Sequence, residues 1–449
     1  MLINYTSWSR DSSFDRHKFF EYVGFLALLA YGFSNLLWPS AGKIVQIVAI
    51  AIGVISFFAY GDKKRTSFPV YLLIAALVIQ ATSWGLGYFN HPEWTSSSPH
   101  LDRLGKIFAF IAYAWLLGGS TRNTLYLWGL SAIGFLLATL LQGHGTDWLT
   151  GLGGQRVDFD MRNAQHTAMF FGTVLLGMTC FSFRIIHHQK RLVPWRFCLW
   201  ALFTVSSLIG LFITQTRAIW LAVTAAMMLM ALAWLCVRLA RNKSNAGKQL
   251  ALSVGALMLI TTSIVWIAKD IVVKRLAAES EVIGTVIAGN FADVPYTSVG
   301  IRIQTWRAAS EWITERPVFG WGENGRSLAI KETSWLPNFV REDFGHLHNY
   351  FLEVWIAYGL VGVGLIAVLA IWIGRGTLQA WRTGVIPNDM ALFSLAFFVF
   401  WIIVNQFESY NSFGSGVYVF NIILAGLTTH IWRAQSIKKT TDRAQEPSQ

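Results

Sequence analysis

Long apolar stretches separated by short polar connectors follow one another along almost the whole chain of 449 residues. A helix needs about 20 predominantly apolar residues to cross the hydrocarbon core of a bilayer. The pattern predicts twelve spanning helices, approximately at 19–38, 43–60, 68–87, 106–120, 124–142, 166–184, 197–214, 218–238, 249–268, 350–374, 390–408 and 415–433. The predicted fold class is therefore an all-α polytopic membrane protein.

Two polar stretches are too long to be simple turns between helices. One covers about 143–165, and the larger one covers about 269–349, between the ninth and tenth predicted helices. The larger stretch carries basic and acidic residues in nearly equal numbers, which indicates a small folded cap. The predicted organisation is membrane helices in 1–268, the cap in 269–349, three further helices in 350–433 and a polar tail in 434–449.

Within the cap, residues 301–315 have the spacing of an amphipathic helix. At about 100° per residue, one face of this helix carries Arg302, Trp306, Ala309 and Ile313. Arg302 thus continues an otherwise apolar stripe. A guanidinium that extends a buried face needs an anion or a wet cavity, so Arg302 is a candidate binding residue.

Composition places the chain in lipid, because 54% of its residues are hydrophobic and 13% are charged, against about 25% charged residues in soluble domains. Its net charge of +12 comes largely from Lys and Arg in alternate connectors. This is the pattern of the positive-inside rule, and it argues against a nucleic-acid partner and predicts cytoplasmic termini. All three cysteines lie in apolar stretches, which argues against a disulfide framework or a zinc cluster.

Several short motifs occur in a characteristic order. They are Thr216-Arg217-Ala218-Ile219-Trp220, Arg302-x-x-x-Trp306, Pro317-x-x-Gly320-x-Gly322, His346-x-His348-Asn349-x-x-Leu352 and Tyr358-Gly359-x-x-Gly362. Together they resemble the O-antigen ligase and polymerase superfamily of bacterial envelope glycosyltransferases, over roughly 150–370. The chain has Ala218 where this family usually has glycine. It has Arg162-Asn163-Ala164-Gln165-His166 where a Gly-Asn-Pro-Asn loop is common.

The resemblance implies a GT-C-like membrane enzyme of the bacterial inner membrane. Members transfer a glycan from undecaprenyl pyrophosphate to an acceptor at the periplasmic face, among membrane lipids and without a metal cofactor. Chain length, helix number and the position of the large loop favour an O-antigen ligase, whose acceptor is lipid A-core. The alternatives are an O-antigen or exopolysaccharide polymerase, a protein O-oligosaccharyltransferase and, from a different class, a transporter or flippase.

The transfer needs a base for the acceptor hydroxyl and cations for the departing pyrophosphate. His348 is the candidate base, because it lies at the amino end of the tenth predicted helix, where the helix dipole favours a neutral imidazole. Arg217 is the first residue of the eighth predicted helix, so its guanidinium group and the free N–H groups of the helix end are able to face one anion. Arg302 is the second candidate for the pyrophosphate. Interfacial histidines and arginines also occur without function, by capping or by reaching lipid headgroups.

Weaker candidates for substrate binding share a location in the predicted outer loops. They are His346, Arg156, Arg162, Asn349 and Trp321, with Glu353 and Glu408 as possible partners of the arginines. The Asp158-Phe159-Asp160 segment resembles a metal-binding element of other glycosyltransferases. Because the family resemblance implies metal-free transfer, these acids are interpreted as a solvated loop and no metal site is predicted. A His346-x-His348 metal site lacks a third ligand with a convincing spacing.

Overall fold

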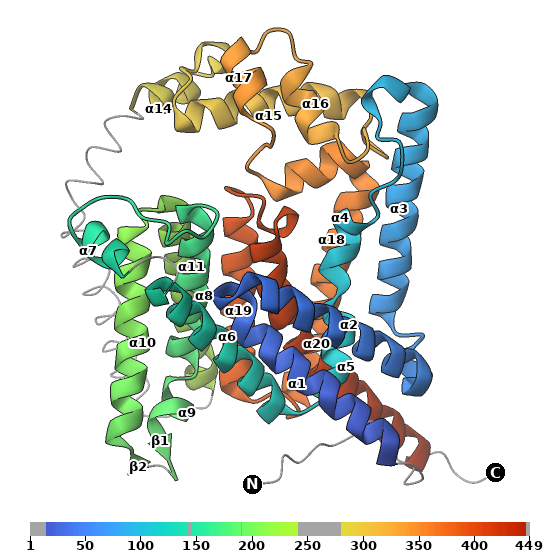
Figure 1. Ribbon diagram of the computed structural model, residues 1–449, viewed down its shortest axis with the longest axis vertical. Helices are drawn as coiled ribbons and strands as arrows, with labels where there is room; N and C mark the ends of the chain where they lie inside the picture. Colours follow the sequence, from blue (N-terminus) through green and yellow to red (C-terminus); the bar gives the residue numbers. More distant parts are fainter. Residues whose placement is uncertain (1–14, 142–144, 190, 241–279, 446–449) are drawn as a thin grey trace.

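The computed structural model describes residues 15–141, 145–189, 191–240 and 280–445, and this part of the chain is almost wholly helical (Figure 1). The amino-terminal elements are α1 (Asp15–Leu37), α2 (Pro39–Tyr60), η1 (Asp62–Lys64), α3 (Phe68–Asn90), η2 (Pro92–Trp94), α4 (Asp102–Gly105), η3 (Lys106–Phe108), α5 (Phe110–Leu117) and α6 (Thr121–Leu141). Next come α7 (Thr146–Leu152), α8 (Ala164–Cys180), α9 (Ser182–Ile186), the short antiparallel strands β1 (His187–His188) and β2 (Arg191–Leu192), α10 (Pro194–Ile213) and α11 (Arg217–Ala240).

The carboxy-terminal half contains the cap and three further long helices. The cap elements are α14 (Ser280–Ile287), η4 (Phe291–Asp293), α15 (Ser298–Glu315), α16 (Gly325–Lys331) and α17 (Asn338–Asp343). They are followed by α18 (Tyr350–Arg382), α19 (Asn388–Val404), η5 (Tyr410–Ser412) and α20 (Gly414–Gln445). In Figure 1 the cap elements lie together at one end of the helix bundle.

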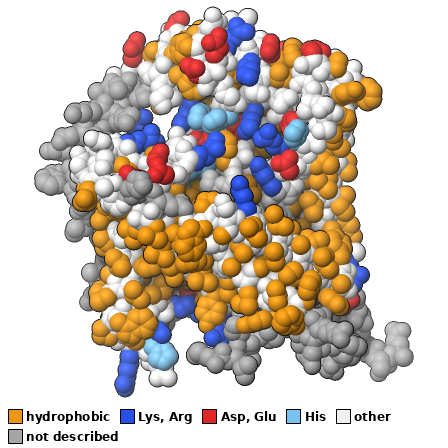
Figure 2. Space-filling view, viewed as in Figure 1, with side chains coloured by type: hydrophobic (Ala, Val, Ile, Leu, Met, Phe, Trp, Pro, Cys, Tyr) orange, Lys and Arg blue, Asp and Glu red, His pale blue; other side chains and the backbone are white. Residues whose placement is uncertain are grey.

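The prediction of an all-α polytopic membrane protein is confirmed. Among the described residues, eight helices are long and apolar enough to cross a membrane, namely α1, α2, α3, α6, α10, α11, α18 and α20. The apolar helix α19 is shorter. Their large exposed hydrophobic side chains form a broad belt on the face shown in Figure 2, as a lipid-facing surface requires.

Two predicted spans are not continuous helices. The 106–120 stretch is divided into η3 and α5, and every residue of α5 is buried, because α5 packs against α1, α2 and α20. The 166–184 stretch is divided at Phe181 into α8 and α9. The predicted span 249–268 lies outside the described residues.

The cap has its own apolar core, in which Ala308, Ala309 and Ile313 of α15 pack with residues of α16 and α17. The predicted stripe on this helix is therefore correct. Trp306, in the same stripe, donates from Nε1 to the Leu347 carbonyl over 2.7 Å. This hydrogen bond attaches α15 directly to the loop that carries His346 and His348.

The Pro317–Gly322 turn is fastened to a break in α18. Gly359 inside α18 has φ 64° and ψ −163°, a conformation that essentially only glycine adopts. Backbone hydrogen bonds join the two segments: Trp321 N to Ile356 O at 2.8 Å, Gly322 N to Ala357 O at 2.9 Å and Leu360 N to Pro317 O at 2.8 Å. The glycines of two sequence motifs thus meet in a structural junction that fixes the cap on the membrane helices.

Replacing Gly359 with alanine is expected to destabilise this junction. An added Cβ would lie 2.0 Å from the Val318 carbonyl oxygen, in addition to a backbone strain of about 1–3 kcal/mol. We expect a lower midpoint of thermal unfolding in detergent and less purified protein. Gly364→Ala is the matched control, because a Cβ at Gly364 of the same helix meets no atom within 4 Å. Equal stability of the two variants would contradict the structural role of Gly359.

Candidate functional site

The histidine loop, residues 345–349, is held in one defined conformation at the start of α18. Asn349 caps this helix by accepting from the Phe351 and Leu352 N–H groups over 3.1 and 3.2 Å, as its sequence position predicts. Leu347 is fully buried in the cap core. His348 has a positive φ of 52°, which is uncommon outside glycine and clusters at functional sites. These constraints direct both imidazoles to one place.

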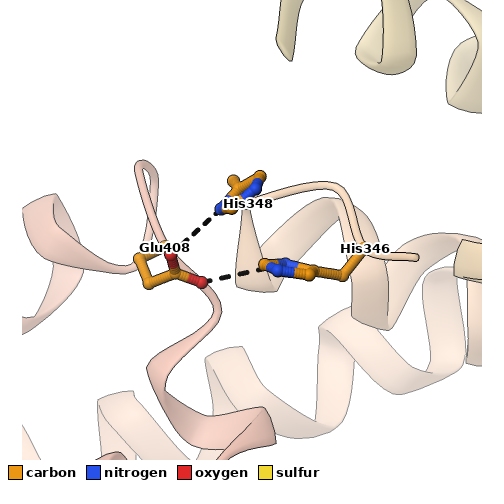
Figure 3. Close-up of side chains that lie close together, drawn as sticks. All are labelled: His346, His348 and Glu408. Carbon is orange, nitrogen blue, oxygen red and sulfur yellow. Dashed lines mark hydrogen bonds and ion pairs between the residues drawn. The ribbon is translucent and has the colours of Figure 1, made fainter. Parts of the chain in front are cut away.

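His348 is paired with Glu408, which follows the end of α19. Its Nδ1 lies 3.0 Å from Glu408 Oε2 (Figure 3). A carboxylate at this distance accepts the proton of Nδ1–H, so in the neutral tautomer that it favours the lone pair is on the second ring nitrogen, Nε2. The same arrangement orients the histidine base of serine hydrolases. Sequence reasoning considered Glu408 only as a partner of arginines, and the structure pairs it with the candidate base.

His346 lies between two buried carboxylates. Its Nδ1 is 3.7 Å from Glu353 Oε1 and 3.8 Å from Glu408 Oε1, and its ring centroid is 3.9 Å from that of His348. Burial, followed by the charge of His348, lowers the pKa of His346 to about 4. The ring is therefore neutral near pH 7, and its contacts with the acids are not ion pairs.

Glu408 remains ionised although its side chain is only 1% exposed. Burial raises its pKa, but the hydrogen bond and charge of His348, the charge of His346 and the Ser409 N–H together lower that pKa to about 2. Ser409 N donates to Oε1 over 2.9 Å. Above about pH 5 the site thus contains a charged Glu408 and a neutral His346. Lowering the pH from 7 to about 5 changes the charge of neither residue.

Gln165 connects Glu408 to Arg302. The Gln165 amide satisfies both neighbours when its nitrogen donates to Glu408 Oε2 over 2.9 Å and its oxygen accepts from Arg302 Nη2 over 3.0 Å. Arg302 makes no ion pair with a carboxylate in the described part of the chain. A half-buried guanidinium that contacts only a neutral amide retains the ability to bind an anion.

Further arginines surround Arg302. Burial lowers the pKa of Arg302, the charge of Glu408 opposes this effect, and the positive charges of Arg217 and Arg156 lower the pKa further. Arg217 is the first residue of α11, as predicted, and is exposed. Arg156 donates from Nε to the Thr214 carbonyl over 3.2 Å, close to the start of α11. Three predicted arginines from distant segments therefore lie near one another and the histidine loop.

Arg162 belongs to the same region through an aromatic contact. Its guanidinium carbon lies 3.5 Å from the centroid of the Phe413 ring, and the Phe413 ring lies 5.5 Å from the His346 ring. The loop before α8 and the turn before Arg217 have unusual backbones, with positive φ at Phe159, Asp160, Arg162 and Gln215. Residues with positive φ thus occur in the loop before α8, the turn before α11 and the histidine loop.

Other predicted residues have different positions. Trp321 is buried in the cap core, where its Nε1 donates to the Trp312 carbonyl over 2.7 Å and its ring contacts Trp94. Packing covers the ring in this structure, and its contact with a sugar stays a prediction. Asp158 and Asp160 are exposed, in agreement with a solvated loop.

Within the described residues, the group best placed to hold a metal ion is His346, His348 and Glu408, whose ligand atoms lie within 4.8 Å of one another. The third ligand, Glu408, lies in the segment after α19 and not in the histidine loop, so the spacing within that loop does not reveal it. Two imidazoles and one carboxylate are a donor set that suits zinc. The same three atoms also form a complete hydrogen-bonded acid–base group without an ion.

Comparison with known proteins agrees with the resemblance found in the motifs. The O-antigen ligase family matches residues 202–367, which include Arg217, Arg302 and His348. An uncharacterized protein of Haemophilus influenzae (strain ATCC 51907 / DSM 11121 / KW20 / Rd) is 31% identical over 134 residues. This alignment covers 28% of the chain and 32% of the relative, so the chain matches about a third of that relative's length.

Proposed function

The chain belongs to the O-antigen ligase superfamily, and from this premise we propose that it is an O-antigen ligase of the bacterial inner membrane. It transfers a polysaccharide from undecaprenyl pyrophosphate to lipid A-core, with the site at the periplasmic face and both termini in the cytoplasm. The observation that carries this proposal is the His348–Glu408 pair, 3.0 Å apart, next to Arg302 and its neighbouring arginines.

In the proposed reaction, His348 Nε2 removes the proton of an acceptor hydroxyl while Glu408 holds the Nδ1–H. The hydroxyl oxygen forms a bond to the anomeric carbon of the donor. The bond from that carbon to the pyrophosphate oxygen breaks, and the electron pair leaves with the pyrophosphate, so the configuration is inverted. A positioned base of this kind contributes typically about 10²–10⁴-fold to the rate.

Arg302, Arg217 and Arg156 are proposed to stabilise the pyrophosphate as its negative charge increases. Their guanidinium groups present paired N–H donors, which match phosphate oxygens. Arg217 acts together with the amino terminus of α11, a 24-residue helix whose dipole favours an anion there. Arg162 and Asn349 are proposed to support the binding loops, and His346 to position the acceptor beside His348.

An apolar pocket between α18, α19 and α20 supports a lipid-linked substrate. Its walls include Ile366, Leu369 and Phe397, while Tyr350 and Asn405 contribute polar groups. Tyr350 follows His348 by two residues, and Asn405 precedes Glu408 by three, so the pocket begins beside the candidate base. We propose that it accommodates part of the isoprenoid chain.

Substitution of Glu408 by glutamine tests the proposed role of the carboxylate. We expect kcat to fall by about 10²-fold or more, because a neutral amide neither fixes the histidine tautomer nor stabilises the imidazolium. The initial rate of transfer is measured at saturating donor and acceptor. Glu315→Gln, on an exposed position at the end of α15, is the matched control. An unchanged kcat in Glu408→Gln would remove the carboxylate from the mechanism.

Deletion of the gene distinguishes the ligase from the nearest alternative. Loss of a ligase leaves carrier-linked polymer and bare core, whereas loss of a polymerase leaves core that carries a single repeat; a gel of the lipopolysaccharide shows which pattern occurs. Purified protein is then expected to perform the transfer in the presence of EDTA. Chelator-sensitive transfer would instead indicate a metal ion on His346, His348 and Glu408.

A further inference from the structure

A second set of cations is connected to His346 through Glu353, whereas Arg302 is connected to it through Gln165 and Glu408. Arg103 of α4, Lys106 of η3 and Arg326 of α16, here called the Lys106 cluster, come from two regions of the chain. The positive charges of Arg103 and Arg326 both repel that of Lys106. Figure 2 shows histidine side chains in a hollow below the cap with Lys and Arg side chains on both sides.

Direct contacts connect the Lys106 cluster to the histidine loop. Arg326 Nη1 lies 3.0 Å from Glu353 Oε2, and Glu353 Oε1 lies 3.7 Å from His346 Nδ1. Lys106 Nζ donates to the Ser412 carbonyl over 2.8 Å, and Ser412 Oγ donates to Glu353 Oε2 over 2.9 Å. The cluster is therefore one carboxylate away from His346, just as the Arg302 side is connected through Glu408.

Asp102, Glu323 and Glu353 are the acids near these cations; the charge of Asp102 acts on Lys106, and the other two already have several partners. Glu323 is shared between Arg103, at 3.6 Å, and His100, at 3.2 Å. Glu353 already accepts from Arg326, Ser412 and the Leu347 N–H. Lys106 is half-buried and makes no ion pair with a carboxylate among the described residues. An ammonium in such a position needs an anion or water as a partner.

Resting on the proposed function, we propose that the Lys106 cluster binds a phosphate ester of the acceptor glycolipid. The donor pyrophosphate is assigned to Arg302, which is reached from His348 through Glu408 and Gln165, and to Arg217 and Arg156, whose charges act on Arg302. An acceptor hydroxyl must then approach His348 from the other side of the histidine pair. Cations on that side select an acceptor that carries negative charge close to its reacting hydroxyl.

The Arg103→Gln/Lys106→Gln double variant tests this site. Glutamine at position 106 retains an N–H donor for the Ser412 carbonyl, and the Arg326–Glu353 ion pair is left intact. The matched control is Arg307→Gln/Lys331→Gln, which removes two charges from the cap surface. Lys106→Arg is a second variant that keeps the charge, and thermal unfolding of each purified protein verifies its fold.

Binding is measured without donor, in nanodiscs, with two probes: purified lipid A-core and the same glycolipid after phosphatase treatment. We expect wild-type protein, the control and Lys106→Arg to bind the phosphorylated probe about tenfold more tightly, in the range of charge-assisted hydrogen bonds. The double variant is expected to bind both probes equally. Its KM for undecaprenyl-pyrophosphate-linked glycan should remain that of wild type.

Three results would overturn the proposal: equal binding of both probes by wild type, a preference that survives in the double variant, or an increase in donor KM without loss of acceptor binding. The last result would assign these cations to the donor. Because binding is measured without transfer, it separates this site from the proposed reaction. Wild-type protein that binds the phosphorylated probe selectively but transfers nothing would reject the reaction alone. Transfer without a phosphate preference would reject the site alone.

Discussion

His348→Ala is expected to abolish transfer while the protein keeps its fold. In the proposed mechanism the imidazole is the base, and the 3.0 Å contact of Nδ1 with Glu408 selects the tautomer whose lone pair is on Nε2. Removal of a positioned general base costs about 10²–10⁴-fold in rate. The substitution also removes few packing contacts, because the His348 side chain is 21% exposed. We therefore expect normal yield and thermal stability, with transfer at the limit of detection.

The matched control for this prediction is His188→Ala, an exposed histidine of β1, which Figure 1 shows at the end of the molecule remote from the cap. Both variants are assayed in membranes by the appearance of glycan on the acceptor, and in purified form by initial rates. His188→Ala should retain wild-type activity. Transfer by His348→Ala at more than a tenth of the wild-type rate would exclude His348 as the base.

Arg302→Lys is expected to lower kcat by about 10²-fold, within the range for the loss of one preorganised donor to a developing anion. Lysine keeps the charge but lacks the planar fork that contacts two phosphate oxygens. It also lacks the second nitrogen needed to hold the Gln165 oxygen and an anion at once. Arg217→Lys should reduce kcat for the same reason. The acceptor KM should change little in either variant.

Arg307→Lys is the control for this series, because Arg307 lies on the same helix and pairs with Glu311 at 3.9 Å on the cap surface. The Arg302→Lys/Arg217→Lys double variant shows whether both arginines bind one anion. Groups that share a ligand give non-additive effects, whereas independent groups give additive ones. Full activity in Arg302→Lys, or strictly additive losses, would contradict a common pyrophosphate site.

Local sequence patterns predicted those site residues whose position depends on a single helix. Arg217 opens α11, Asn349 caps α18 and Arg302 extends the buried stripe of α15. Each of these follows from helix periodicity or from the chemistry of a helix end. Trp321 shows the limit of this reasoning. A tryptophan in a polar loop is consistent with a sugar contact, but the burial of its ring depends on Trp312 of the preceding helix and on Trp94, which is far away in the chain.

The residues that connect the site are separated by long stretches of chain. Gln165 precedes Arg302 by more than a hundred residues, and Glu408 follows His348 by sixty. A signal did exist for Glu408, since an acidic residue directly after an apolar span needs a partner when buried. The sequence does not identify that partner, because both arginine and histidine are able to pair with a buried carboxylate.

The order of residues by itself determined that the chain enters the membrane repeatedly, where the cap lies and which helix ends carry histidine and arginine. The length of an apolar stretch, the periodicity of a helix and the residues at its ends depend on a few helical turns, so they can be recognised in the sequence alone. Only the tertiary structure decided that Glu408 contacts His348, that Gln165 connects Glu408 to Arg302 and that Lys106 is connected to Glu353 through Ser412. These pairings arise when distant helices pack together, and no local energy encodes them.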